Sequence, residues 1–308
     1  MSAMAQRAPA GRRFGARLLD RADRRSVQVL LLPTLVVVAI VDGLPLVYSL
    51  VVSLQNRSLD NPHTAFVGLR NYASLFQDDQ TWQSIGLSLT FTAGSVALSF
   101  VVGLGGALLL NPPLRGRGII RALFIIPWAV PAFVAALTWS WIYNDQFGIL
   151  DALLKDFGVA HPPVWLDANH AMISLVIVMF WKSFPFQLIM LLAGLQAIPL
   201  DLYEAARVDG AGFLRQFWHI TMPLLRPVAM ISTLLAVINA FQYFPIPWVL
   251  TQGGPANATN VIPISSYNFA FQAGDVSLGA TVAVIMFLVI LVGALGYLWL
   301  YVKKVGRL

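Results

Sequence analysis

The chain of 308 residues contains no cysteine and few charged side chains. Without cysteine it can form neither disulfide bonds nor thiolate metal sites. Its four histidines include no local pair at metal-ligand spacing, and we predict no metal site. Charged residues make up 11% of the chain, against about 25% in a soluble domain, while hydrophobic residues make up 58%. Such a composition cannot cover a water-facing surface and indicates several membrane spans.

The sequence also lacks the residues by which a membrane transporter would power itself. A phosphate-binding loop needs a glycine-rich turn followed by lysine, and none of the four lysines follows a glycine. Ion-coupled carriers usually bury carboxylates, but only Asp42 lies inside an apolar segment, beside Gly43 and Pro45, where the helix could end or bend. No nucleophile–base pair suits an embedded hydrolase. We therefore predict a non-enzymatic scaffold that another protein drives.

Six apolar segments have the length of a membrane-spanning helix, which needs about 20 residues. They cover residues 27–54, 85–110, 119–143, 171–198, 228–250 and 276–302. Barrel strands would be about ten residues long and alternating, so the fold class is all-α with six transmembrane helices. An even number of spans places both termini on one side of the membrane. In the second span, Gly103, Gly105 and Gly106 indicate close helix packing.

The distribution of the basic residues predicts the orientation. The tail 1–26 carries seven of the 20 lysines and arginines, and three each lie in the 2–3 connection, the 4–5 connection and the C-terminal segment 303–308. Only three lie on the opposite side. By the positive-inside rule, both termini are cytoplasmic. The net charge of +6 thus follows the membrane topology, and we expect no nucleic-acid partner.

Segments outside the spans carry weaker patterns. Residues 14–25 place apolar side chains on one helical face among arginines, which is typical of a helix lying on the membrane surface. Residues 1–13 fit a disordered basic tail equally well. On the outer side, 145–169 repeat apolar residues at helical spacing, and 68–76 fit a second short helix. We expect the membrane domain to occupy 27–302.

The cytoplasmic 4–5 connection, residues 197–227, is unusually well patterned. Asp201 and Glu204 lie three apart, as in the capping box that starts a helix. Ala205 and Ala206 are small, so another backbone can approach the helix closely. The dipeptide of Asp209 and Gly210 predicts its end. We predict a short helix offered to a partner, because ordering a loop this long without a purpose is costly.

A second amphipathic helix is expected to follow, with three apolar side chains on one face, and prolines mark the entry to the fifth span. The residues are Phe213, Phe217, Ile220, Pro223 and Pro227. Together with Glu204, Ala205, Ala206, Asp209, Gly210 and Ala211, they match the EAA signature of the permease subunits of bacterial ABC importers. Met222 departs conservatively from the leucine usual there.

The chain further resembles the carbohydrate branch of that family, the MalF-like permeases. The similar stretches are 68–76, 125–144, 181–187, 193–199 and 250–255. The resemblance runs from about residue 27 to 302. It implies a type I ABC importer permease fold in the bacterial inner membrane, and it implies import of a sugar, expected to be a di- or oligosaccharide.

The resemblance also implies an assembly. Its expected members are a homologous second permease, an ABC ATPase dimer that binds ATP and Mg²⁺, and an extracytoplasmic sugar-binding protein; this chain needs no cofactor of its own. The ATPase-coupling element would comprise Glu204, Ala205, Ala206, Asp209, Gly210, Ala211 and Arg215. For Arg215 and for Arg207, a solvated arginine is an equally good interpretation.

Candidate sugar contacts lie in the fourth and fifth spans, because sugars are bound by aromatic faces and by amide or hydroxyl groups. They are Trp181, Lys182, Gln187, Asn239, Gln242, Tyr243 and Phe244. Helix-packing hydrogen bonds are the alternative for Asn239 and Gln242, and a structural ion pair or snorkelling is the alternative for Lys182. Two other functions stay open: a permease of the same architecture for a solute such as glycerol phosphate, and an ion-coupled carrier.

Overall fold

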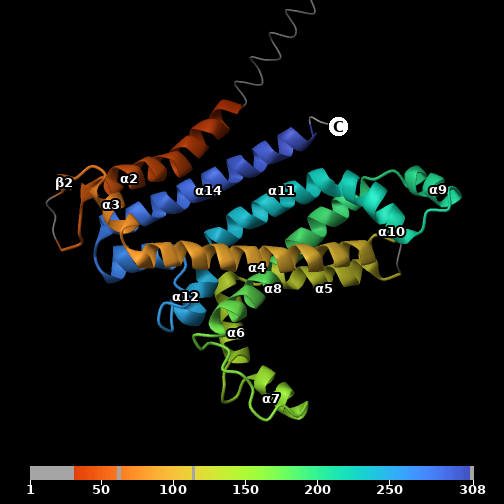
Figure 1. Cartoon of the computed structure of the whole chain (residues 1–308), viewed down its shortest axis with the longest axis horizontal. Coiled ribbons are helices and arrows are strands. Elements are labelled where there is room, and N and C mark those ends of the chain that lie inside the picture. The colour runs from red at the N-terminus through yellow and green to blue at the C-terminus, as the bar shows by residue number, and fades with distance from the viewer. Residues whose placement is uncertain (1–30, 61–63, 113–114, 306–308) are drawn as a thin grey trace, which may run out of the picture. The chain divides into compact units, whose positions relative to one another are not determined.

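The computed structural model describes residues 31–60, 64–112 and 115–305 (Figure 1). The chain divides into two compact units, residues 1–52 and 53–308. The basic tail 1–26, with its predicted surface helix 14–25, lies outside the described residues. The described part is predominantly helical, as the composition predicts.

The first unit is described from Leu31 and is helical. It contains the π-helical turn η1 (Ala39–Gly43) and most of α2 (Leu44–Ser53). Pro45 has no N–H to donate to the carbonyl one turn earlier, and such positions favour a wider turn. The helix therefore continues past Asp42 through η1 and does not end there.

The second unit holds the remaining elements. In chain order they are β1 (Gln55–Asn56), β2 (Ala65–Phe66), α3 (Arg70–Phe76), α4 (Asp79–Leu110), α5 (Arg117–Ala129), α6 (Ala132–Ile142), α7 (Ile149–Asp156), α8 (Ala171–Gln196), α9 (Leu200–Val208), α10 (Phe213–Gln216), the π turn η2 (Phe217–Thr221), α11 (Met222–Phe241), α12 (Pro245–Thr251), α13 (Ile262–Tyr267), the π turn η3 (Asn268–Gln272) and α14 (Val276–Val305). The strands β1 and β2 pair antiparallel, with Gln55 opposite Phe66. The short helices α3 and α7 confirm the helices expected within 68–76 and 145–169.

The packing of α4 against α8 is the most extensive helix contact of the second unit. A Cβ added to Gly103 would lie 2.8 Å from the Cβ of Gln187, and one added to Gly106 would lie 2.6 Å from a methyl carbon of Leu188. These two glycines therefore let the helices touch, as predicted. Gly105 has no such neighbour within 4 Å, so the expectation of close packing is wrong there.

Five helices of the described residues are long and apolar enough to cross a membrane: 31–53, 79–110, 171–196, 213–241 and 276–300. A sixth span results if α5 and α6 are counted together as one broken span, because these two helices are bent by 92°. The prediction of a span over 119–143 did not include this bend. Pro131 cannot continue the helical hydrogen bonds, and it holds Val130 in an extended conformation with ψ of 130°.

The fifth span also differs from its prediction. We expected a separate amphipathic helix and then a span over 228–250, but the chain is helical from Phe213 to Phe241 without interruption. Pro223 falls just after η2, where the backbone N–H of Met222 bonds to the carbonyl of Phe217, five residues earlier. This wider turn accommodates the proline that we interpreted as a boundary. After Phe241 the helix breaks, and α12 begins at Pro245.

Candidate functional site

Helix α9 follows directly on the end of α8 and lies at one end of the second unit, beside α10 (Figure 1). Pro199 occupies its N-cap position, and no side chain caps its first turn. The predicted capping box of Asp201 and Glu204 is therefore wrong. Asp201 lies inside the first turn, where the positive end of the helix dipole stabilises its negative charge.

The other end of α9 is closed by a Schellman motif. The backbone N–H of Ala211 bonds to the carbonyl of Ala206 at 2.8 Å, and that of Gly210 bonds to the carbonyl of Arg207 at 3.1 Å. Gly210 has φ of +74°, a left-handed conformation that costs a residue with a side chain about 1–2 kcal/mol. The predicted helix end at Asp209 and Gly210 is confirmed, and it sets the sharp reversal into α10.

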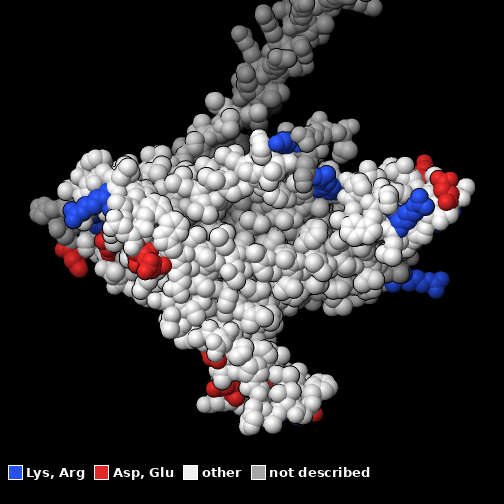
Figure 2. Space-filling model, viewed as in Figure 1, with Lys and Arg blue, Asp and Glu red and all other residues white. Residues whose placement is uncertain are grey.

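No residue of α9 is buried. Val208 is 88% exposed and Leu200 71%. In the next segment Phe213 and Leu214 are about as exposed as Leu200. Acidic and basic side chains gather over the same end of the molecule (Figure 2). Apolar and charged residues exposed together on one helix, with none of them in the core, are typical of a surface for a partner.

Side-chain hydrogen bonds hold α9 to the start of the fifth span. The Tyr203 hydroxyl lies 2.9 Å from the Thr221 hydroxyl in η2, and the Gln216 amide donates to the carbonyl of Ala211 at 2.6 Å. Of the predicted coupling residues, Glu204, Ala205, Asp209, Gly210 and Arg215 are exposed, and Ala206 and Ala211 are half-buried. The structure thus presents them along α9, the turn that follows it and α10. Their contact with a partner stays a prediction.

In the membrane part, Lys182 of α8 reaches the break between α5 and α6. Its ammonium donates to the carbonyls of Pro127 at 3.2 Å, Trp128 at 2.9 Å and Val130 at 2.5 Å. These carbonyls lie at the end of α5 and in the link beyond it, where the break removes helical partners. The lysine is therefore engaged with backbone, and no ion pair to a carboxylate is found for it among the described residues.

A cavity of about 430 Å³ lies beside this break, at the meeting of α5, α8 and α11. Lys182, Asn239 and Tyr243 all line it, so the structure brings three predicted pathway residues together. Sequence reasoning missed the other lining residues, which are Trp128, Ser183, Phe186, Leu235 and Ala236. Leu235 and Ala236 lie one helical turn before Asn239, so helical spacing could have found them. Trp128 comes from the bent helix and carried no such signal.

The remaining predicted pathway residues lie elsewhere. Gln187 is fully buried against α4 and donates its amide to the carbonyl of Ser232 at 3.2 Å, so it packs between helices. Trp181 packs edge-on against Trp139. Gln242 is exposed at the end of α11, and Phe244 stacks on Trp248. None of these four lines the cavity.

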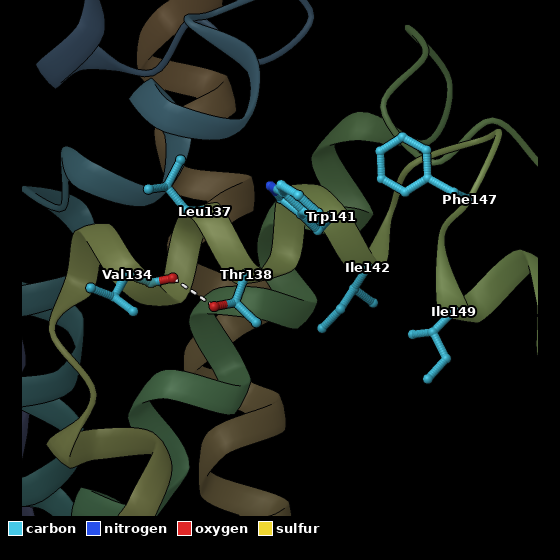
Figure 3. A pocket seen from close by; sticks show the side chains of 7 residues that line it. All are labelled: Val134, Leu137, Thr138, Trp141, Ile142, Phe147 and Ile149. Atoms are coloured by element: carbon cyan, nitrogen blue, oxygen red, sulfur yellow. Dashed lines mark hydrogen bonds between the residues drawn. The ribbon is translucent and has the colours of Figure 1, made fainter.

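Two further pockets lie elsewhere in the second unit. One, of about 490 Å³, is almost wholly apolar; Figure 3 shows Leu137, Trp141 and Phe147 along it. Its hydroxyl, that of Thr138, donates to the carbonyl of Val134 at 2.9 Å (Figure 3). The other, of about 390 Å³, is polar and lies between the start of α4 and the segment 257–273. Among the described residues, no group of three or more metal-ligating side chains occurs.

The fold has counterparts among solved structures. It matches a chain in the crystal structure of a bacterial ABC transporter involved in the import of the acidic polysaccharide alginate, with a TM-score of 0.76 over 92% of this chain and 98% of that chain. A chain of the inward-facing MetNI methionine ABC transporter matches with a TM-score of 0.52 over 70% of this chain and 91% of that chain. At 21% and 17% identity, these likenesses define the fold, which is that of a type I ABC importer permease.

Sequence comparison is more specific. Residues 97–303 match the family described as the binding-protein-dependent transport system inner membrane component. The chain is 40% identical to the trehalose/maltose transport system permease protein MalF of Thermococcus litoralis, over 91% of this chain and 92% of that protein. It is 33% identical to the sulfoquinovosyl glycerol transport system permease protein SmoG of Agrobacterium fabrum, over 88% of each chain. It is also 33% identical to the trehalose transport system permease protein SugA of Mycobacterium tuberculosis, over 89% and 87%.

The chain therefore belongs to the family of inner membrane components of binding-protein-dependent transport systems. It is a multi-pass ABC transporter permease, and this family is one of transport components with no catalytic role indicated. The EAA resemblance and the inner-membrane location are confirmed, and the interpretation as an ion-coupled carrier falls away.

Proposed function

We propose that this chain is the permease of an ATP-driven importer, and that it passes a neutral di- or oligosaccharide delivered by an extracytoplasmic binding protein. The observation that carries the proposal is α9, a short helix with no buried residue that follows the C-terminal end of the fourth span. The names of the relatives, two of which concern trehalose or maltose, support a sugar as the cargo.

The coupling step is assigned to α9. A separate ATPase would receive the exposed residues of α9, with Glu204 pairing with a basic group and the small Ala205 allowing close approach. Because α9 follows α8 after three residues, a force on α9 acts on the fourth span. Closure of the ATPase dimer on ATP would then drive rigid-body alternating access. ATP and Mg²⁺ belong to the ATPase, and this chain contributes no cofactor.

The cavity beside the α5–α6 break is assigned to the cargo. Trp128 offers an aromatic face, and Ser183, Asn239 and Tyr243 offer hydrogen-bonding groups suited to sugar hydroxyls. A lysine ammonium has three N–H donors, and those of Lys182 face three backbone carbonyls. With the charge so engaged, the cavity favours an uncharged solute over a phosphate. A homologous second permease would complete the pathway.

Uptake by the reconstituted transporter tests the coupling assignment. The double variant Glu204→Ala with Gly210→Pro should abolish ATP-driven uptake while the assembly still purifies intact. Helix α7 provides a matched control, because Gly158 closes it with the same pair of Schellman bonds as Gly210 closes α9. Asp156→Ala with Gly158→Pro should keep most of the uptake. Normal uptake by the α9 variant would refute the assignment.

A further inference from the structure

The break in the third span has its own stabilising residue on a neighbouring span. The Nζ of Lys182 lies within 3.2 Å of the carbonyl oxygens of Pro127, Trp128 and Val130. These three residues belong to the last turn of α5 and the extended link to α6. Lys182 is separated from them by more than 50 positions and belongs to α8. The contact therefore joins two spans at the point where one of them changes direction.

Electrostatics explains why a lysine suits this place. The last carbonyls of a helix carry its negative dipole end and find no partner within the helix. Inside a membrane no water replaces the missing donors, so each unpaired carbonyl is costly. One ammonium with three donors serves three such groups at once. The lysine and the break thus stabilise each other, although neither would be favourable in the membrane alone.

The position of Lys182 within α8 gives this contact a mechanical consequence. Helix α8 packs on α4 on both sides of Lys182, and its C-terminal end runs into α9 within three residues. A displacement of α9 that shifts α8 must also shift Lys182 and, through its three bonds, the end of α5. That end forms a wall of the 430 Å³ cavity through Trp128. The bonds of Lys182 therefore link the coupling helix to the cavity wall, beside the packing of Phe124 of α5 on Phe184 of α8.

We propose that Lys182 is a positioning residue, a latch that makes the α5–α6 break follow α8 during the transport cycle. The latch keeps the wall of the cavity in register with α8 while the bundle changes between its two states. This inference rests on the proposed coupling through α9. The role requires the charge and the donors of Lys182, but it requires no contact with cargo.

The test compares Lys182→Met, which keeps the length and removes the donors, with Lys182→Arg, which keeps charge and donors. The exposed Lys155 of α7 gives the matched control, Lys155→Met. Because the chain has no cysteine, Phe133→Cys on α6 and Ile189→Cys on α8 provide two exposed spin-label positions in each background. The label distance is measured in the full transporter, with cysteine-free partners, without nucleotide and with trapped ATP.

We expect one narrow distance distribution in both states for the otherwise unmodified chain, for Lys155→Met and for Lys182→Arg. Lys182→Met should broaden the distribution and lower ATP-driven uptake about tenfold. If Lys182→Met does not assemble, Lys182→Arg decides: a broad distribution with normal uptake would overturn the latch. A narrow distribution in Lys182→Met would overturn it as well.

Failure of the latch and failure of the proposed function give different results. If the unmodified transporter shows no ATP-driven uptake, the proposed function is wrong, whatever the distances are. If uptake is normal and depends on α9 but the label distance ignores Lys182, only the latch is wrong. A label distance that changes between the two states in the unmodified chain would also refute it, because α6 would then move independently of α8.

Discussion

The contact between α4 and α8 gives a sharp prediction, because two neighbouring glycines differ in what surrounds them. A methyl group added at Gly103 would lie 2.8 Å from the Cβ of Gln187 and 3.0 Å from the backbone nitrogen of Leu188. The nitrogen belongs to the helix itself and cannot rotate away as a side chain can. At Gly105, two residues further, a methyl group meets nothing within 4 Å.

The expected magnitude follows from these distances. Carbon atoms pack best at about 3.5–4.0 Å, so Gly103→Ala must push α4 and α8 apart by about 1 Å along the contact. Overpacking of this kind costs about 1–3 kcal/mol, and a gap of about 1 Å forfeits up to half of the dispersion energy of the atoms around it. Gly105→Ala removes a flexible residue from a helix and should be neutral or stabilising by up to about 1 kcal/mol.

Thermal unfolding of the purified transporter in detergent, followed by the loss of monodisperse protein, measures the difference. Gly103→Ala should lower the midpoint by several degrees, and Gly105→Ala should leave it unchanged or raise it. The packing of Gln187, whose amide bonds to α11, should suffer in the first variant alone. Equal midpoints for the two variants would refute the close contact that the structure assigns to Gly103.

Three further outcomes are expected. Gly210→Ala adds no clash but forces a side chain to φ of +74°. This strain, about 1–2 kcal/mol, should distort the end of α9 and lower uptake several-fold. The equally strained Gly158→Ala on α7 should leave uptake unchanged. Asn239→Leu should raise the KM for sugar uptake and leave basal ATPase activity unchanged; equal loss of both would indicate packing. Bonds from the His170 backbone and ring keep the pKa of Asp167 below its ordinary value, so the loop stabilisation holds above the ordinary carboxyl range and is lost as pH falls through the lowered pKa. The protection of the His170 amide against hydrogen exchange, relative to the intrinsic rate at each pH, should therefore fall in acid, and protection that does not change with pH would contradict this.

The spans could be predicted from the sequence because their apolar length is a local property. The bend of the third span could not, although Pro131 was visible, because the direction of a broken helix depends on its neighbours. Here the neighbour is Lys182, on another span. In the fifth span, Pro223 suggested a boundary. The π-helical turn before Pro223 lets the helix continue through the proline, and sequence patterns do not predict such turns.

The candidate site was predictable where residues share a helical face. Asn239 and Tyr243 are one turn apart in the sequence and line the same cavity. Lys182 and Gln187 are five residues apart, which turns their side chains about 140° from each other on α8. That is why Lys182 reaches the cavity while Gln187 is buried toward α4, a difference that residue type alone conceals.

The coupling helix was the most predictable part of the site. Its composition, its length and its glycine stop are all local, and the structure places the end of α9 where the sequence put it. Its beginning was mispredicted, because Pro199 takes the position that a capping side chain would need. The partner of α9 is a long-range property of the assembly, so its identity stays with the proposal.

One measurement tests the central claim most directly. The chain, tagged and purified from its membrane in mild detergent, is analysed for co-eluting subunits and assayed for ATP hydrolysis and uptake with a panel of neutral and anionic sugars. We predict that a second permease and an ATPase co-elute, and that one neutral sugar stimulates turnover only with its binding protein. Stimulation by an anionic solute alone would contradict the neutral cargo, and sugar uptake by the isolated chain without ATP would contradict the account as a whole.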